Sequence, residues 1–342
     1  MYKILITTVG GLTSPSVISA VRELGDTYIV GVDPFELAVG RFFVDKFYKV
    51  TYSFDNEIKF IDELCDIIKK EEIDILVPCG NEDNLTIAKF IDKFGNIKVL
   101  VNDYETLVKA FDKGLVYKNL KRYVPEAAPN FYIVKTYEEF LDALNFLGYP
   151  RKRIVIKPRL GRGGRGVYVL SEKLSFEKVF SSKPNLEYPQ EFFDKVLKDT
   201  DVFPELIVME YLSEPIYSIY SLCLEGNTII AMTHIREWGN ASQTFRGTVY
   251  YDKKLEEIAS KINKIFNLSF NINMEFATSN DGRIVLFDLN PRVAASSAID
   301  RKIGLNFITL SIKTLLGEKI KIDKDKFKNK KRFIRYFEER WL

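Results

Sequence analysis

The feature that most constrains this chain is a basic, glycine-rich segment between two short apolar runs. Residues 154–169 read Ile-Val-Ile-Lys-Pro-Arg-Leu-Gly-Arg-Gly-Gly-Arg-Gly-Val-Tyr-Val. Apolar runs bounded by glycine are typical of β-strands, so we expect a strand, a loop and a second strand. Glycine accepts positive φ and carries no Cβ, which lets backbone N–H groups approach phosphate oxygens. The residues predicted to bind phosphate here are Lys157, Gly161, Gly163, Gly164 and Gly166.

A second pair of segments, residues 273–276 and 287–292, supplies candidate metal ligands. They read Asn-Met-Glu-Phe and Phe-Asp-Leu-Asn-Pro-Arg. Glu275 lies on an apolar strand, where a carboxylate without a partner is costly. Asp288 and Asn290 alternate along the next strand and so face one side. Mg²⁺ takes such oxygen ligands together with substrate phosphates, so the two features predict a nucleoside triphosphate site with Mg²⁺ or Mn²⁺.

Composition places the chain among ordinary globular proteins. Its 342 residues are 46% hydrophobic and 28% charged, with a net charge of +3, and this near balance implies no nucleic-acid or membrane partner. Three cysteines without metal-ligand spacing support neither a disulfide framework nor a zinc site. We find no signal peptide or membrane span, so we expect a cytoplasmic protein. A locally basic stretch, 319–332, is interpreted as a solvated helix or strand edge.

The first hundred residues alternate short apolar runs with helical patterns, which predicts a parallel sheet covered on both faces. The expected strands are 3–8, 27–32, 75–77 and 98–101, and the expected helices are 16–24, 58–70 and 84–94. In such sheets, ligands bind at the carboxyl ends of the strands, here in the loops 8–16, 33–34 and 78–83. The Gly10-Gly11 pair does not match the spacing of a dinucleotide fingerprint, so NAD binding is disfavoured, while a role in binding a second substrate stays open.

The remainder predicts a compact α+β unit and then an antiparallel sheet. Expected helices are 104–123, 137–147, 190–198, 254–266 and 306–316. Expected strands are 130–134, 153–157, 167–170, 206–210, 216–224, 228–236, 271–278 and 283–289.

Five motifs in this order resemble the ATP-grasp superfamily, in its branch of carbamoyl phosphate synthetase large-subunit-like and biotin carboxylase-like proteins. The motifs are Phe111-Asp-Lys113, Val155-Ile-Lys-Pro158 with its glycine loop, Val208-Met-Glu-Tyr-Leu212, Asn273-Met-Glu-Phe276 and Asp288-Leu-Asn-Pro-Arg292. A glycine loop alone would be weak evidence, but five ordered motifs are specific. The resemblance extends from about residue 3 to residue 316.

The resemblance implies an α/β and α+β architecture in which a preATP-grasp domain precedes the ATP-grasp fold. We expect a preATP-grasp parallel α/β domain over 1–104, a lid subdomain with the glycine loop over 105–205, an antiparallel-sheet domain with the metal site over 206–318, and a basic tail over 319–342. Whether the chain forms a homodimer, as many relatives do through the first domain, stays open.

The resemblance also assigns roles to residues. Lys113 and Lys157 look like the phosphate-contacting lysines, and the loop glycines look like a flexible cover. The segment Glu210, Tyr211 and Leu212 looks like the hinge strand that meets the adenine through backbone groups and a carboxylate. The metal ligands implied are Glu275, Asp288 and Asn290, and Arg292 looks like the charge that steadies the acyl phosphate.

The implied reaction is an ATP-dependent ligation. A substrate carboxylate attacks the γ-phosphate of ATP to give an acyl phosphate and ADP, and an amine or thiol then expels phosphate. Both substrates are expected to be small molecules. Two alternatives stay open, namely a single-unit synthetase that uses bicarbonate or carbamate, and a nucleotide-binding relative without catalysis.

Several positions depart from the family pattern or keep two interpretations. Where relatives carry Glu-Tyr-Ser-Val-Asp for the ribose, this chain reads Ile-Tyr-Ser-Ile-Tyr over 216–220, so two interpretations stay open: Glu214 replaces the ribose contact, or that contact is lost. The turn after Arg292, residues 293–297, lacks the usual glycines. His234 is interpreted as structural, whereas Arg236 and Arg246 are open between substrate recognition and surface solvation.

Overall fold

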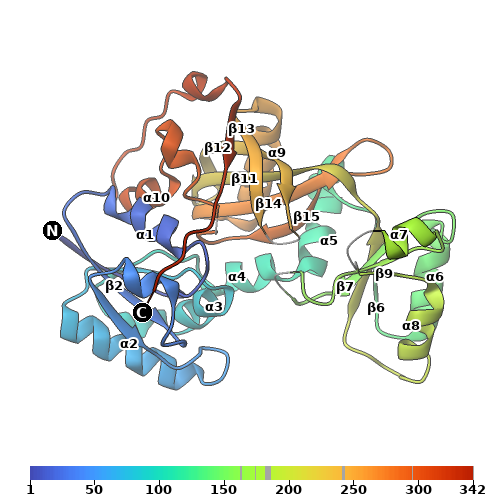
Figure 1. The fold of residues 1–342 in the computed structure, drawn as a ribbon, viewed down its shortest axis with the longest axis horizontal. Coiled ribbons are helices and arrows are strands. Elements are labelled where there is room, and N and C mark those ends of the chain that lie inside the picture. Colours follow the sequence, from blue (N-terminus) through green and yellow to red (C-terminus); the bar gives the residue numbers. More distant parts are fainter. Residues whose placement is uncertain (162–163, 174, 182–185, 241–242, 295, 342) are drawn as a thin grey trace. The chain divides into compact units, whose positions relative to one another are not determined.

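The computed structural model describes residues 1–161, 164–173, 175–181, 186–240, 243–294 and 296–341 (Figure 1). The chain divides into two compact units. Unit 1 comprises residues 1–111, 217–275 and 289–342, and unit 2 comprises residues 112–216 and 276–288. The predicted Gly163 lies outside the described residues.

Unit 1 begins with a five-stranded parallel sheet of strand order β3-β2-β1-β4-β5, which confirms the predicted α/β architecture. Its strands are β1 (Tyr2–Ile6), β2 (Thr27–Asp33), β3 (Lys46–Lys49), β4 (Ile75–Val77) and β5 (Lys98–Val99). The accompanying helices are α1 (Ser14–Arg22), α2 (Glu57–Glu71), α3 (Asn81–Lys89) and α4 (Tyr104–Phe111), with short 3₁₀ turns at Val39–Phe42 and Ile91–Phe94. Strand β3 was not predicted from the sequence.

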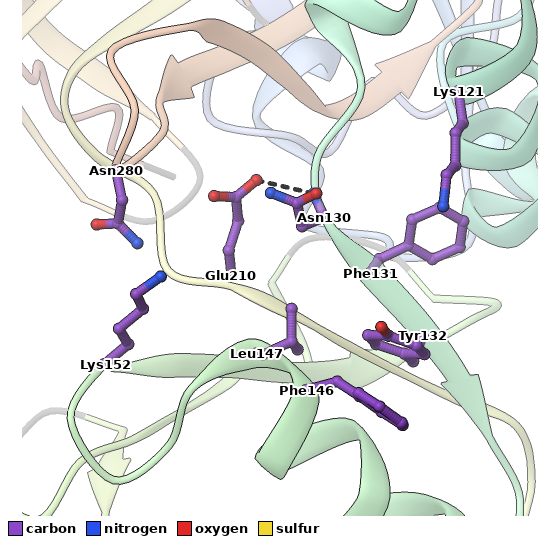
Figure 2. Close-up of a pocket in the computed structure, with 9 residues that line it drawn as sticks. All are labelled: Lys121, Asn130, Phe131, Tyr132, Phe146, Leu147, Lys152, Glu210 and Asn280. Carbon is purple, nitrogen blue, oxygen red and sulfur yellow. Dashed lines mark hydrogen bonds between the residues drawn. The ribbon is translucent and has the colours of Figure 1, made fainter.

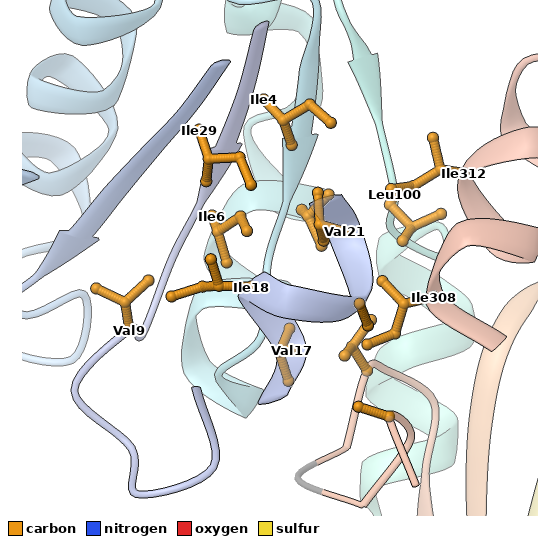
Figure 3. Packing of buried hydrophobic residues seen from close by; sticks show 14 of the residues in the cluster. Ile4, Ile6, Val9, Val17, Ile18, Val21, Ile29, Leu100, Ile308 and Ile312 are labelled. Atoms are coloured by element: carbon orange, nitrogen blue, oxygen red, sulfur yellow. The ribbon is translucent and has the colours of Figure 1, made fainter. Parts of the chain in front are cut away.

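Alternation along β1 explains why both faces of this sheet are buried. Ile4 and Ile6 point to one face and pack with Ile18 of α1, whereas Leu5 points to the other face and packs with Phe60 of α2. Figure 3 shows the first of these cores, in which residues of α1 lie between the strands and two isoleucines of α10 (Phe307–Leu315), Ile308 and Ile312. The C-terminal helix therefore completes the core of the N-terminal sheet.

Unit 2 contains a mixed sheet of order β6-β10-β7-β8-β9, in which the β8–β9 pair is parallel and the other three pairs are antiparallel. Its strands are β6 (Phe131–Val134), β7 (Ile154–Pro158), β8 (Tyr168–Leu170), β9 (Glu187–Tyr188) and β10 (Leu206–Glu210). The helices are α5 (Lys113–Tyr123), α6 (Tyr137–Leu147), α7 (Phe176–Phe180) and α8 (Gln190–Leu197), with a 3₁₀ turn at Pro125–Ala127.

A third sheet has the order β15-β14-β11-β12-β13-β16. It consists of β11 (Ser213–Leu224), β12 (Asn227–Gly239), β13 (Thr244–Tyr250), β14 (Phe270–Thr278), β15 (Ile284–Asn290) and β16 (Lys331–Ile334), and α9 (Lys253–Phe266) connects β13 to β14. The pairs β12–β13 and β13–β16 are antiparallel, as predicted for this part of the chain. Further 3₁₀ turns lie at Asp300–Ile303 and Lys324–Phe327.

The structure corrects three expectations about elements. The single helix predicted over 104–123 is two helices, because Asp112 leaves helical geometry (φ −85°, ψ 100°) and its carboxylate accepts the Leu115 N–H at 3.0 Å as a new N-cap. Strand β13 lies in a segment for which no strand was predicted. Strand β16 lies in the basic tail and pairs with β13. Among the described residues, no helix is both long and apolar enough to cross a membrane.

Candidate functional site

Lys113 stands at the start of α5, where the Asp112 cap fixes the helix end. Its ammonium donates to the carbonyl oxygen of Gly161, the first loop glycine, at 2.7 Å. The same ammonium lies 3.1 Å from a carboxylate oxygen of Asp288. Unit 2 thus brings together a predicted phosphate lysine, the beginning of the glycine loop and a predicted metal carboxylate.

A second ion pair fixes the start of α5 against the end of β7. Arg159 donates to both carboxylate oxygens of Asp112, at 2.8 and 2.7 Å, and pairs with Glu205 at 2.5 Å. Burial alone would raise the pKa of Asp112, but the Arg159 guanidinium and the capping N–H bonds hold it below its ordinary value. The motif 111–113 therefore supplies the Lys113 charge and, through Asp112, the contacts that fix where α5 begins.

Lys157 is buried on β7, two residues before Arg159. Its ammonium donates to the hydroxyl oxygen of Tyr117 at 2.7 Å and to the carbonyl oxygen of Phe287 at 3.0 Å. Burial and the nearby Lys113 charge lower the pKa of Lys157 to about 7. Both predicted lysines therefore contact the middle of β15, at residues 287 and 288.

The glycine loop is described at Gly161, Gly164 and Gly166. Gly164 and Gly166 have positive φ, 72° and 70°, a region that favours glycine. A Cβ on Gly166 would lie 3.0 Å from Cγ of Pro158. The loop therefore folds back over the residue that follows Lys157, and a larger residue at 166 would meet both strain and contact.

The predicted hinge strand places Glu210 on the face of the sheet opposite to Lys157. The β10–β7 register pairs Ile207 with Lys157, so Ile207 and Met209 share its face, whereas Val208 and Glu210 point toward α6. The Glu210 carboxylate accepts the Asn130 N–H at 2.8 Å and lies 3.8 Å from Arg283. A backbone contact between the hinge and adenine stays a prediction, and the structure does not bring the Glu210 carboxylate to Lys157.

A pocket of about 300 Å³ lies on this α6 side of unit 2 (Figure 2). Tyr132 and Phe146 stack at one edge, with ring centroids 5.6 Å apart. The residues that line the pocket are Lys121, Asn130, Phe131, Tyr132, Phe146, Leu147, Lys152, Glu210 and Asn280.

The other predicted nucleotide-binding residues of this segment are Tyr211, Leu212 and Glu214. The Arg153 guanidinium lies over the Tyr211 ring, 3.6 Å from its centroid, and Leu212 is partly buried. Glu214 is exposed. Its proposed contact with a ribose remains a prediction.

Glu275 on β14 is held by three neighbours within unit 1. Its carboxylate accepts from the Ser218 hydroxyl at 2.8 Å, from the Asn273 amide at 3.2 Å and from Arg236, whose guanidinium lies 3.3 Å away. Arg236 also donates to the Thr244 hydroxyl at 3.1 Å. Arg236 is thus a partner of a predicted metal ligand, a role the sequence left open.

The fit of a divalent cation depends on the chemistry of its donors. Among the described residues no group of three or more His, Cys, Asp or Glu side chains is placed to hold a metal ion by itself. Mg²⁺ is usually bound by one or two carboxylates together with waters and substrate phosphates. The predicted set of Glu275, Asp288 and Asn290 has two carboxylates and one amide, which fits a cation carried by a nucleotide.

Arg292 meets the loop at the carboxyl end of β4 inside unit 1. Its guanidinium donates to the side-chain oxygen of Asn81, at the start of α3, and to the Val293 carbonyl at 2.9 Å. The loop 78–83 was predicted to be a ligand loop, and it lies beside the predicted catalytic arginine. Residue 295 of the following turn lies outside the described residues.

Two neighbouring loops of unit 1 are held by buried carboxylates. Asp33, at the end of β2, accepts the Gly10 N–H at 2.6 Å, and Asp83 accepts from the hydroxyls of Thr8 at 2.5 Å and Ser53 at 2.8 Å. A Cβ on Gly10 would lie 2.7 Å from the Asp33 carboxylate oxygens, so glycine is required there. The Gly10-Gly11 turn has this structural role; its part in binding a second substrate stays untested.

His234 is buried, and its Nε2 lies 2.8 Å from the Asp300 carboxylate. Its ring packs on Tyr220, with centroids 4.6 Å apart. These contacts agree with the structural interpretation. Arg246 pairs with Glu237 at 3.4 Å.

The side chains that contact predicted site residues but were not singled out from the sequence include Tyr117 and Asn81. Tyr117 follows Lys113 by four positions, which places both on one helix face, so that spacing was an available signal. The contact of Asn81 with Arg292 joins residues 211 positions apart, and no local pattern indicates it.

Part of the chain matches a known protein family, and most of it is similar to known enzymes. Residues 202–339 match the family described as ATP-grasp in the biosynthetic pathway with Ter operon. The carbamoyl phosphate synthase large chain of Clostridium acetobutylicum is 23% identical over 318 residues, which are 88% of this chain and 27% of that protein. The corresponding protein of Methanobrevibacter smithii is 24% identical over 306 residues, 87% of this chain and 28% of that protein. The chain thus spans about a quarter of the length of these relatives.

Solved structures extend the similarity over nearly the whole chain. N5-carboxyaminoimidazole synthetase from Staphylococcus aureus, complexed with ADP, superposes with a TM-score of 0.68 at 17% identity and covers 94% of this chain and 78% of that one. Biotin carboxylase from Campylobacter jejuni has a TM-score of 0.68 at 16% identity and covers 95% of this chain and 73% of that one. These matches confirm the predicted fold.

Proposed function

Because the chain belongs to the ATP-grasp superfamily, we propose that it is an ATP-dependent ligase that activates a carboxylate as an acyl phosphate and joins it to an amine or thiol. The observation that carries this proposal is the cluster in unit 2, where Lys113, Lys157 and Asp288 lie together at the middle of β15. Two ammonium groups beside a carboxylate form a site for a polyphosphate that arrives with a divalent cation.

In the first step, a carboxylate oxygen of the acid forms a bond to the γ-phosphorus of ATP, and the bond from that phosphorus to the β,γ-bridging oxygen breaks. ADP leaves with the electron pair. Lys113 and Lys157 hold phosphate oxygens as point charges, and the amides near Gly164 and Gly166 add directional donors. The protein's contribution here is mainly position and charge, since phosphoryl transfer requires little covalent work from side chains.

In the second step, the amine nitrogen bonds to the acyl carbon, the carbon–oxygen bond to phosphate breaks, and the nitrogen loses a proton to solvent or the departing phosphate. Arg292 is proposed to neutralise charge on the acyl phosphate, and its contact with Asn81 holds the guanidinium beside the loop 78–83. Glu275, Asp288 and Asn290 would hold Mg²⁺ or Mn²⁺, and the bound cation would supply charge neutralisation at the phosphates.

The names of similar proteins support a small-molecule ligase. Solved neighbours include N5-carboxyaminoimidazole ribonucleotide synthetases, biotin carboxylases and an L-amino acid ligase from Bacillus licheniformis. We therefore propose small carboxylate and amine substrates. One neighbour, a Hydrogenobacter thermophilus biotin carboxylase domain, is described as a dimer, which supports a homodimer here. Cys65, Cys79 and Cys223 are free thiols, which supports a cytoplasmic location.

The test is release of ADP and phosphate from Mg·ATP in a matrix of carboxylic acids and amines. The ligase proposal expects turnover that needs one acid and one amine together, and a product whose mass equals their sum less water. Turnover with bicarbonate and no organic acid would instead favour a carbamate-type synthetase, as the carbamoyl phosphate synthase relatives suggest. Tight ADP binding without turnover under every condition would identify a non-catalytic relative.

A further inference from the structure

Tyr117 is a completely buried polar side chain in unit 2 that the reaction described above does not use. It lies on α5 four residues after Lys113, so the two side chains point from the same face of the helix. A buried hydroxyl needs a hydrogen-bond partner, and its partners show what a tyrosine does there.

The Tyr117 hydroxyl joins two groups next to the candidate phosphate site. It donates to the Phe287 carbonyl oxygen at 2.6 Å and accepts from the Lys157 ammonium at 2.7 Å. Lys157 donates to the same carbonyl at 3.0 Å. The Tyr117 hydroxyl, the Lys157 ammonium and the Phe287 carbonyl are therefore all hydrogen-bonded to one another, and Phe287 directly precedes Asp288.

The ring of Tyr117 is fixed independently of these hydrogen bonds. It packs edge-on against Phe131, with ring centroids 5.2 Å apart, and its hydroxyl is 3.9 Å from the Met209 sulfur. The Lys157 ammonium lies 5.2 Å from the ring centroid. Because packing determines where the ring lies, the hydroxyl has a defined position before any ligand binds.

Lysine carries its charge on four rotatable bonds, and fixing such a stem costs side-chain entropy. The Tyr117 hydroxyl and the Phe287 carbonyl hold the ammonium of Lys157 at the middle of β15, next to Asp288, which pairs with Lys113. A charge that is already oriented needs no reorganisation when phosphates arrive.

We infer that Tyr117 is a positioning residue for nucleotide binding, whose hydroxyl orients the Lys157 ammonium toward the phosphates of ATP. The inference rests on the proposed function. Tyr117 lies outside the five motifs. Helix α5 would then contribute two groups to the phosphate site, the Lys113 ammonium and the Tyr117 hydroxyl.

The test is a double-mutant cycle on the affinity for Mg·ADP and Mg·ATP, measured by calorimetry with the full chain. Tyr117→Phe keeps the ring and removes only the hydroxyl. Because hydrogen bonds to charged groups are worth about 1.5–3 kcal/mol, we expect its Kd to rise about tenfold or more. The matched control is Tyr123→Phe on the same helix, where the tyrosine is exposed, and it should leave Kd unchanged.

The cycle separates positioning from packing. If Tyr117 acts through Lys157, the Tyr117→Phe change should have little effect in a Lys157→Met background, because the group it orients is gone. Thermal unfolding of each variant confirms that affinity is measured well below its Tm. A Kd for Tyr117→Phe within twofold of wild type overturns the inference, and so does an equal loss of affinity in both backgrounds.

Failure of the proposed function has a different signature. If wild-type protein does not bind Mg·ADP or Mg·ATP, the nucleotide site itself is wrong, and the inference is overturned with it. If wild type binds and Lys157→Met weakens binding while Tyr117→Phe does not, the proposed function stands and only the role of Tyr117 is rejected.

Discussion

The Lys113 ammonium lies 3.1 Å from a carboxylate oxygen of Asp288, so a predicted phosphate contact and a predicted metal ligand form an ion pair. Both residues belong to unit 2. Phosphates would compete with Asp288 for Lys113, and a divalent cation would compete with Lys113 for Asp288. Nucleotide and cation should therefore bind better together than either does alone.

Asp288→Asn should separate these two effects. Removing the carboxylate frees Lys113, so ATP binding in the presence of a chelator should equal or exceed that of wild type. Loss of a cation ligand should lower Mg²⁺-dependent turnover by about two orders of magnitude. Calorimetry with and without Mg²⁺ measures the first effect, and phosphate release measures the second.

Asp281→Asn is the control for that variant, because Asp281 is exposed in the β14–β15 turn and pairs with Arg283. It should leave both the affinity and its dependence on Mg²⁺ unchanged. If Asp288→Asn binds ATP with the wild-type response to Mg²⁺, Asp288 is not a cation ligand.

The pKa of Lys157, lowered to about 7 by burial and by the nearby Lys113 charge, predicts a pH-dependent affinity for ATP. Above this pKa, Lys157 is neutral in the free protein. Bound phosphates are anionic and favour its protonated form, so Lys157 should take up a proton when ATP binds. Affinity should fall as pH rises through 7 and stop falling above the pKa of the nucleotide complex. Calorimetry at pH 8 in two buffers of different ionisation enthalpy measures the uptake.

Lys157→Met should abolish the proton uptake and weaken binding at pH 6. A control, Lys195→Met, removes an exposed lysine that pairs with Glu191 and should retain both. Equal observed enthalpies in the two buffers for wild-type protein would show that Lys157 does not change its protonation state on binding.

The sequence predicts most of the elements because their local patterns are strong. Strand 75–77 and helix 137–147 match the structure at both ends. The helix combines periodic apolar residues, the Thr136 side chain capping Glu139 N–H and a C-terminal glycine with φ 89°. Such signals lie within one segment, and no tertiary contact is needed to interpret them.

Elements that depend on distant partners were not predictable in the same way. Strand β16 is a short basic run whose apolar residue Phe333 lies 5.9 Å, ring to ring, from His234 of β12. Its pairing with β13 joins residues about 80 positions apart, such as Thr248 and Arg332. The break at Asp112 combines a local cap on the Leu115 N–H with a distant contact, because Arg159, 47 positions later, binds both carboxylate oxygens.

The candidate site shows the same division. The chemical types of Lys113, Lys157 and Glu275 follow from the motifs, and the structure supplies their partners. Arg236 illustrates this, since the sequence left it between substrate and solvent, and it lies 3.3 Å from the Glu275 carboxylate. The face of the sheet on which Glu210 lies could be determined only from the β10–β7 register. Strand alternation shows which residues share a face, but the pairing is needed to show which face that is.

Glu275→Gln should reduce turnover strongly with little loss of stability. The amide can still accept from the Ser218 hydroxyl, but it removes the charge that faces Arg236 and the proposed cation. We expect Mg²⁺-dependent phosphate release to fall by about 100-fold, while Tm changes by only a few degrees. Glu237→Gln is the control, since Glu237 pairs with Arg332 on the exposed edge and should keep wild-type turnover. Wild-type turnover in Glu275→Gln would exclude this carboxylate as a cation ligand.

Asp112→Ala should destabilise the chain, because Asp112 caps α5 and holds Arg159 at two positions. Loss of a cap costs about 0.5–2 kcal/mol, and loss of the partly buried partner of Arg159 adds to it. The folded pKa of Asp112 is lowered, so the stabilisation should be complete above the ordinary aspartate pKa and disappear as pH falls through the lower folded value. Urea unfolding of wild type and variant from pH 7 to pH 2 should therefore show a difference in the free energy of unfolding that disappears at acid pH. Glu105→Ala on α4, which removes an exposed partner of Lys109, should show no such difference, and a constant difference across the whole range would contradict the assignment.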